Sequence, residues 1–173
     1  SAASADVAGL QITELALPHH DASTRVAIWY PSSSPDAPSR YAENPVFQGV
    51  DAHVDGEMAG GRYPLVLFSH GMGGTDRAQA WLGSALAEQG VISVLVNHPN
   101  STWGNFDMAK GVEHWTRAQD MSAALDMILA EPSFAERIDM SRIMAAGFSF
   151  GGWTALSLGG ATGNHAGSVE TCA

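Results

Sequence analysis

The chain has 173 residues, of which 45% are hydrophobic and 15% are charged, so it can bury one sizeable core, and its length favours a single domain. Its 18 Asp and Glu residues outnumber its 8 Lys and Arg residues, which gives a formal net charge of -10 at pH 7. This acidic balance argues against nucleic acid or an anionic membrane surface as a partner. No apolar run reaches the roughly 18–20 residues that a membrane span needs.

The chain is predicted to begin with a β-hairpin. Residues 10–17 alternate apolar and polar side chains, as a strand with one buried face does, and residues 24–30 form its antiparallel partner. His19 and His20 lie in the polar turn between them. Residues 31–62 are rich in Pro, Ser, Gly and Asp, which predicts a long surface loop near the rim of a site.

No metal site is expected in these first segments. Asp51, His53 and Asp55 have the residue types of metal ligands, but a fourth ligand is missing nearby, so a solvated polar loop is favoured. The same argument assigns His19 and His20 to a turn.

Strands and helices alternate in the rest of the chain. A continuous apolar run at residues 64–68 predicts a buried strand of a parallel sheet, and further buried strands are predicted at residues 91–96 and 142–146. Helices are predicted at residues 77–89, 112–130 and 150–158. Arg117 and Asp120 lie three positions apart on the second helix, so each is expected to pair with the other or with a neighbour. This order predicts a mostly parallel sheet with flanking helices, which binds ligands at the carboxyl ends of its strands.

One short motif carries the predicted chemistry. Residues 147–151 are Gly-Phe-Ser-Phe-Gly and lie between a predicted strand and a predicted helix, which is the context of a nucleophile elbow. Gly147 and Gly151 remove side chains that would clash in the tight turn, and a strained backbone lifts the Ser149 hydroxyl clear of the sheet. The N-terminus of the following helix supplies partial positive charge. We therefore expect Ser149 to be a nucleophile.

A glycine-rich loop after the first parallel strand is expected to complete an oxyanion hole. The loop sequence is Ser-His-Gly-Met-Gly-Gly, and Gly71 and Gly73 let backbone N–H groups point into a site. Acyl transfer needs two such donors, and the loss of one costs roughly 10²–10³ in rate. We assign the donors to the N–H groups of Met72 and Phe150. His70 is expected to orient the loop and not to act as the catalytic base.

These motifs resemble a known family. The segments at residues 68–74, 97–99 and 137–152 are similar to those of bacterial relatives of platelet-activating-factor acetylhydrolase and dienelactone hydrolase, in the α/β-hydrolase superfamily. The resemblance covers roughly residues 10–160. It implies an α/β-hydrolase fold and a serine hydrolase of ester-type substrates, with Ser149 as nucleophile and Met72 and Phe150 as oxyanion donors. It does not imply a particular substrate.

The acid and the base of the expected triad are missing from the chain. Such hydrolases place them in the order Ser, acid, His, whereas His165 here precedes Glu170, the one acidic residue after Ser149. His165 also lies just beyond the helix that leads away from the site, so we do not expect it to be the base. Residues 1–173 are therefore predicted to be the N-terminal portion of a single α/β-hydrolase domain, whose C-terminal strands carry the acid and the His.

Three origins fit such a half domain: a second chain cut from the same precursor, a gap that divides one chain, or a truncated chain. Cys172 is the only cysteine, and it favours the first two because a disulfide could tether a second segment. The start, Ser-Ala-Ala-Ser-Ala, resembles what remains after signal-peptide cleavage, so a periplasmic or secreted protein is expected. A trimmed recombinant form would begin in the same way.

Some aromatic and polar residues are weaker candidates for substrate contact. His98 ends a predicted strand near the site, where structural hydrogen bonding is favoured over contact with substrate. Trp103, Phe106 and Trp115 are candidates for an acyl or aromatic pocket. Core packing explains Trp115 equally well, because it lies on the apolar face of its helix.

The sequence thus predicts a serine esterase that works through an acyl-enzyme, with no metal or organic cofactor. An amidase or peptidase on the same fold is the alternative among enzymes, because its chemistry is shared. A non-catalytic binding protein that retains the fold is the alternative of another class.

Overall fold

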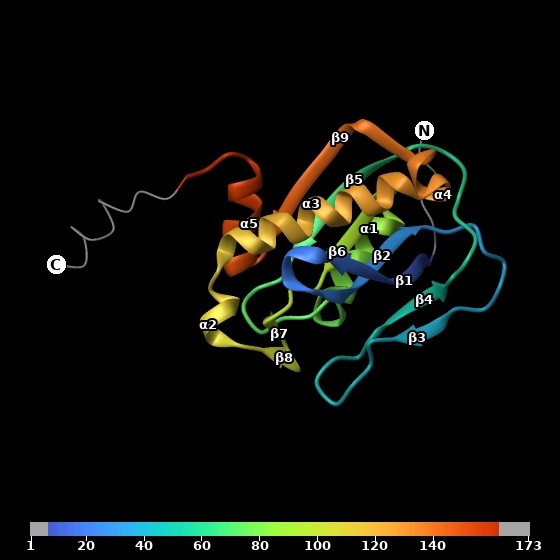
Figure 1. Cartoon of the computed structure of the whole chain (residues 1–173). Coiled ribbons are helices and arrows are strands. Elements are labelled where there is room, and N and C mark those ends of the chain that lie inside the picture. The colour runs from blue at the N-terminus through green and yellow to red at the C-terminus, as the bar shows by residue number, and fades with distance from the viewer. Residues whose placement is uncertain (1–6, 163–173) are drawn as a thin grey trace.

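A seven-stranded mixed sheet forms the centre of the protein (Figure 1), whose computed structural model describes residues 7–162. The strand order is β3-β4-β1-β2-β6-β5-β9. The strands of this sheet are β1 Ala8–Leu17, β2 Ala22–Pro31, β3 Ser39–Tyr41, β4 Val50–Val54, β5 Tyr63–Ser69, β6 Ile92–Val96 and β9 Ile138–Gly147. The short strands β7 Ser101–Thr102 and β8 Asn105–Phe106 pair separately. The helices are η1 Pro18–His20, η2 Arg77–Gln79, α1 Ala80–Glu88, α2 Met108–Gly111, α3 His114–Ala130, α4 Pro132–Ala135 and α5 Phe150–Leu158.

The strand pairing confirms the predicted hairpin and the predicted parallel core. β1 and β2 are antiparallel over their whole length, and β5 is parallel to both β6 and β9. β2 joins the two parts because it pairs antiparallel with β6. The sheet as a whole is mixed, with the parallel strands β6, β5 and β9 at one side. None of the helices in the described part of the chain has both the length and the apolar character needed to cross a bilayer.

The prediction of one long loop over residues 31–62 is wrong. This segment contains β3 and β4, which pair with each other, and β4 also pairs in parallel with β1. The polar residues at positions 51 and 53 belong to β4, in which Ala52 is fully buried between them, and position 55 lies in the turn that follows. Short strands near the edge of a sheet need few apolar residues because their backbone hydrogen bonds supply much of the pairing, so composition concealed them.

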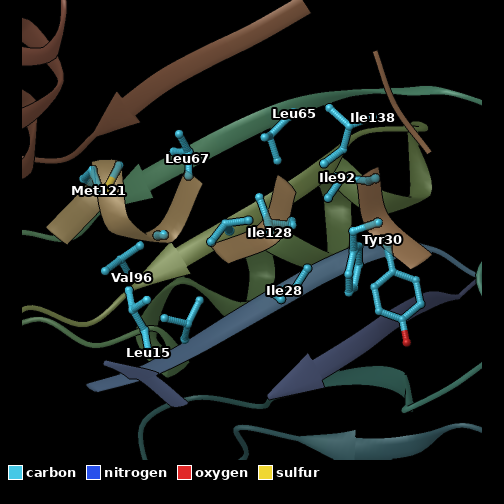
Figure 2. Packing of buried hydrophobic residues seen from close by; sticks show 14 of the residues in the cluster. Leu15, Ile28, Tyr30, Leu65, Leu67, Ile92, Val96, Met121, Ile128 and Ile138 are labelled. Atoms are coloured by element: carbon cyan, nitrogen blue, oxygen red, sulfur yellow. The ribbon is translucent and has the colours of Figure 1, made fainter. Parts of the chain in front are cut away.

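Helices cover both faces of the sheet. α1 packs on β1, β2 and β6 from one side, and α3 packs on β1, β5 and β6 (Figure 1). Figure 2 shows Met121 and Ile128 of α3 beside Leu67 and other apolar side chains of the sheet. Full burial of each such side chain contributes about 1.5–3 kcal/mol, so the α3 face is a major source of stability.

Trp115 does not belong to this core, contrary to one of its two interpretations. The buried positions of α3 are Arg117, Asp120, Met121, Ala124 and Ile128, at the three- and four-residue spacing of one helix face. Trp115 lies two positions before this face begins, and it is 56% exposed.

The sheet ends at β9, where the described residues leave apolar surface open. β5 is the only described neighbour of β9. Large apolar side chains on β9, the following turn and α5 are exposed: Met140, Met144, Phe148, Trp153 and Leu156. The described residues therefore leave the flank of the sheet beyond β9 uncovered.

Candidate active site

Ser149 lies in a strained turn between β9 and α5. Its φ and ψ angles are 53° and -118°, a backbone conformation that costs a residue with a side chain about 1–3 kcal/mol. It is the N-cap residue of α5, yet its side chain makes no capping hydrogen bond. Ser149 is also exposed. The turn thus presents a hydroxyl that helix capping does not occupy.

Two glycines make this turn possible because backbone atoms approach them closely. A Cβ atom on Gly151 would lie 1.9 Å from the carbonyl oxygen of Ser69 at the end of β5. A Cβ atom on Gly147 would lie 2.1 Å from the carbonyl oxygen of Gly151. Real Cβ contacts are never this short, so both flanking positions of the motif require glycine.

The glycine-rich loop that follows β5 packs against this turn. A Cβ atom on Gly71 would lie 3.3 Å from Cβ of Ser149. Gly73 has a positive φ of 73° and donates its N–H to the carbonyl of Ser101, which holds the loop in place. Within residues 7–162, the N–H groups of Met72 and Phe150 have no hydrogen-bond partner. Two backbone donors at the turn are therefore available to an anion.

His70 is buried beneath this loop, and its ring nitrogens are engaged. Nδ1 donates to the carbonyl of Gly71 at 2.7 Å, and Nε2 accepts from the backbone N–H of His98 at 3.2 Å. Burial, together with the nearby His98, lowers the pKa of His70 to about 3. His70 is thus a neutral ring that holds the loop, in keeping with the orienting role expected for it.

His98 takes part in a buried chain of hydrogen bonds that the sequence did not reveal. Its Nε2 lies 2.8 Å from Oγ of Ser69, and its Nδ1 lies 2.7 Å from Oδ2 of Asp120. Burial lowers the pKa of His98 to about 4, although the hydrogen bond with Asp120 opposes this shift. The three residues have the order of a catalytic triad, but Ser69 and His98 are fully buried and out of reach of a substrate.

The ring of His98 is fully buried, and its candidate role in substrate contact stays a prediction. The structural hydrogen bonding that was favoured over it is what the ring does. No sequence pattern could have linked His98 to Asp120, because one follows β6 and the other lies in the middle of α3.

Arg117 is a second residue whose position was not foreseen. Its guanidinium donates from Nη2 to the carbonyl of His70 at 2.7 Å and lies 4.9 Å from the ring centre of Phe150. Burial lowers its pKa to about 10, against the opposing effect of Asp120. Arg117 and Asp120 thus bond to other neighbours instead of to each other. The positive charge of Arg117 thus lies next to the His70 carbonyl and the Phe150 ring.

An apolar groove adjoins the same loop. It has a volume of about 640 Å³, and its walls are formed by Met72, Gly73, Trp103, Gly104 and Phe106. Trp103 is 81% exposed, at the turn between β7 and β8. The structure therefore places two of the three predicted aromatic residues beside the loop, while Trp115 is not part of this groove.

The described residues supply no base for Ser149. His19, His20, His53, His70, His98 and His114 are the histidines of this part of the chain, and none of them contacts Ser149. His165, Glu170 and Cys172 lie outside the described residues.

Comparisons with known proteins agree with this geometry. Residues 48–112 match the family described as platelet-activating factor acetylhydrolase, isoform II. Cutinase est2 of Thermobifida alba is 35% identical over 98 residues, which are 56% of this chain and 30% of that protein. Cutinase cut1 of Thermobifida fusca has the same identity over 28% of its length. The chain thus spans about a third of the length of the curated relatives it matches.

Solved structures show the same fold. The ferulic acid esterase from Streptomyces cinnamoneus superposes with a TM-score of 0.72 at 25% identity, covering 87% of this chain and 54% of the esterase. A dienelactone hydrolase-like promiscuous phosphotriesterase from metagenomic libraries superposes with a TM-score of 0.56 at 18% identity, over 87% of this chain and 54% of that protein. The fold is that of an α/β-hydrolase.

Proposed function

We propose that this chain is the N-terminal part of a serine hydrolase domain that cleaves carboxylic ester bonds through an acyl-enzyme. The observation that carries the proposal is the exposed Ser149, held at a φ of 53° beside the unpartnered N–H groups of Met72 and Phe150. A binding protein gains nothing from a strained serine whose hydroxyl caps no helix.

In the proposed reaction, Oγ of Ser149 attacks the ester carbonyl and its proton passes to a His outside residues 7–162. The N–H groups of Met72 and Phe150 stabilise the tetrahedral oxyanion. The alcohol leaves with the proton from that His, and water then attacks the acyl-enzyme with the same His as base. The acid is released and Ser149 regains its proton.

The substrate proposed is an ester with an apolar acyl or aromatic part. The names of the similar proteins, cutinase and ferulic acid esterase, describe enzymes of the ester-cleaving class. In this chain the apolar groove beside Met72, with Trp103 and Phe106 in its walls, provides an apolar surface next to the oxyanion donors. The hydrophobic effect of such a groove favours burial of an acyl chain or ring.

A second segment of the same protein is proposed to supply the His, the acid and further strands beside β9. The support for this segment is the apolar surface that β9 and α5 leave exposed, which a soluble fold covers. Cys172 is the residue that could tether it through a disulfide. Unchanged migration on a gel with and without reductant would remove the tether and leave the rest of the proposal intact.

Labelling with a fluorophosphonate probe tests the proposed function. The folded full-length protein should be labelled at Ser149, as mapped by peptide mass spectrometry. The Ser149→Ala variant should lose labelling and about 10⁴-fold or more of its activity on a nitrophenyl ester. Ser122→Ala, an exposed serine on α3, is the control and should keep both.

Two outcomes would contradict the proposal. A folded full-length protein that is not labelled would be an inactive scaffold. A protein that cleaves a matched anilide faster than the ester would be an amidase.

A further inference from the structure

Three histidines surround one buried carboxylate, that of Asp120. They lie far from it in the sequence, so the cluster is visible only in the structure. Oδ1 of Asp120 lies 2.6 Å from Nε2 of His19 and 3.0 Å from Nε2 of His20. Its Oδ2 lies 2.7 Å from Nδ1 of His98. Each of the three rings thus directs one nitrogen at the carboxylate of Asp120. In the sequence, this residue lies on a helix about a hundred positions after the turn that carries His19 and His20.

The local structure of the hairpin turn brings the two adjacent histidines together. Pro18 begins the short helix η1, and Asp21 ends it in the left-handed conformation, with a φ of 49°. The rings of His19 and His20 lie 4.6 Å apart between their centres. Their side chains are 24% and 9% exposed, whereas that of Asp120 is 1% exposed. The cluster therefore has a buried anionic side and a side that opens to solvent.

The donor atoms are of the kind and spacing that a transition metal ion uses. One ligand atom from each of His19, His20 and Asp120 lies within 4.8 Å of the other two. Zn²⁺ binds imidazole nitrogen and carboxylate oxygen at about 2.0–2.2 Å, which separates donors around a tetrahedral ion by about 3.3–3.5 Å. Small rotations of the two imidazoles would meet this spacing. Ca²⁺ and Mg²⁺ prefer oxygen ligands, so the two nitrogens disfavour them.

The surroundings of Asp120 also match those of a ligating carboxylate. His98 donates to the oxygen that faces away from the two outer histidines, as the outer partners of metal ligands do. Arg117, on the same helix, directs Nη2 to the carbonyl of His70 and forms no ion pair with Asp120. Two imidazoles and one carboxylate, with a fourth position open to water, make the ligand set of many zinc sites.

We propose that His19, His20 and Asp120 form a binding site for a divalent transition metal ion, with Zn²⁺ as the best match. The ion fastens the β1–β2 turn to α3 and fixes the carboxylate that receives His98. Through His98 and Ser69 it is linked to the end of β5, where the glycine-rich loop starts. None of the three proposed ligands takes part in the reaction proposed above, so metal binding can be measured separately from activity.

Metal titration of the full-length protein tests this site. The protein is freed of metal with a chelator, dialysed and titrated with ZnCl₂ at about pH 7.5 by calorimetry. One ion should bind per chain, and the melting temperature should rise with zinc concentration.

The double variant His19→Gln/His20→Gln should lose more than about 100-fold in zinc affinity, since the loss of even an outer partner costs about 10–100-fold. Both residues are on the surface side of the cluster, so the variant should fold, which circular dichroism verifies. His53→Gln on β4 is the control and should keep the affinity. Zinc binding that is equal in the double variant, or absent from the unaltered folded protein, would show that the histidines only hydrogen-bond to Asp120.

Discussion

At the scale of single residues, the geometry around Ser149 depends on contacts that allow no substitution. Gly151 is buried and its α-carbon faces the carbonyl of Ser69, whereas the neighbouring Gly152 has room for a side chain. Both are adjacent residues in the first turn of α5. They therefore form a matched pair: both are glycines in the same helical turn, and they differ in the space available for a side chain.

Gly151→Ala is expected to lower the free energy of unfolding by about 3 kcal/mol or more, because its Cβ would lie 1.9 Å from the Ser69 oxygen and would force β5 and α5 apart. Gly152→Ala meets only the Gly147 oxygen at 3.8 Å, so it should be neutral or stabilising by about 0.5–1 kcal/mol. Urea denaturation measures both. Equal losses in the two variants would contradict the close contact.

The low pKa of His70 leads us to expect that the stability of the protein depends on pH. Its pKa is about 3 in the folded protein and 6.5 for the unperturbed ring. As the pH falls below about 6.5, the unfolded chain takes up a proton that the folded protein does not. The free energy of unfolding should then decrease by up to about 1.4 kcal/mol per pH unit for this residue.

His98, with a pKa of about 4, acts in the same direction. Denaturation at about pH 7 and about pH 5 measures the effect in a range where few carboxylates titrate. His70→Gln should reduce the slope. A stability that stays constant over this range would mean that the ring is protonated in the folded protein.

At the scale of elements, the buried chain Ser69–His98–Asp120 connects β5, the end of β6 and α3. Each contact is local, but together they set where the glycine-rich loop begins relative to the helices. These groups are buried, so the loss of one leaves the others without a partner, which costs more than the bond itself contributes.

His98→Ala is expected to lower the free energy of unfolding by about 3 kcal/mol, because it leaves the Ser69 hydroxyl and one oxygen of Asp120 unpaired in the core. The displaced loop should also slow fluorophosphonate labelling of Ser149. Ser122→Ala on the exposed side of α3 should change stability by less than about 0.5 kcal/mol. If His98→Ala were as stable as this control, the chain of hydrogen bonds would not hold the elements together.

At the scale of the whole molecule, the exposed apolar surface along β9 and α5 is the feature that supports the proposed second segment. Met144 on β9 is 60% exposed and Met108 on α2 is 59% exposed, so the two side chains are equally exposed in the described part of the chain. The proposed second segment would bury the first and not the second.

Met144→Lys should therefore destabilise the full-length protein by about 2 kcal/mol or more, since burial of a methionine contributes about 1.5–3 kcal/mol and a buried charge adds a cost. Met108→Lys should change stability by less than about 0.5 kcal/mol. Thermal and urea denaturation of the two variants give the comparison. Equal behaviour would mean that β9 is an outer edge of the finished protein.

The sequence by itself determined the elements whose information is local. The alternation of residues 10–17, the apolar runs of β5 and β6, and the glycines around Ser149 each express a period or a turn within a few residues. Backbone sterics act over the same range, so the hairpin, the parallel core and the position of the elbow followed without a structure.

The tertiary structure alone decided what depends on contacts between distant segments. The composition of β3 and β4 indicates a loop, but β4 pairs with β1 and β3 pairs with β4, so both form strands. The cluster around Asp120 joins a hairpin turn, a strand end and the middle of a helix, and Trp115 is exposed because the helix face begins two residues later. Hydrogen bonds and burial join residues by position in space, and one sequence without its fold does not record which distant side chains meet.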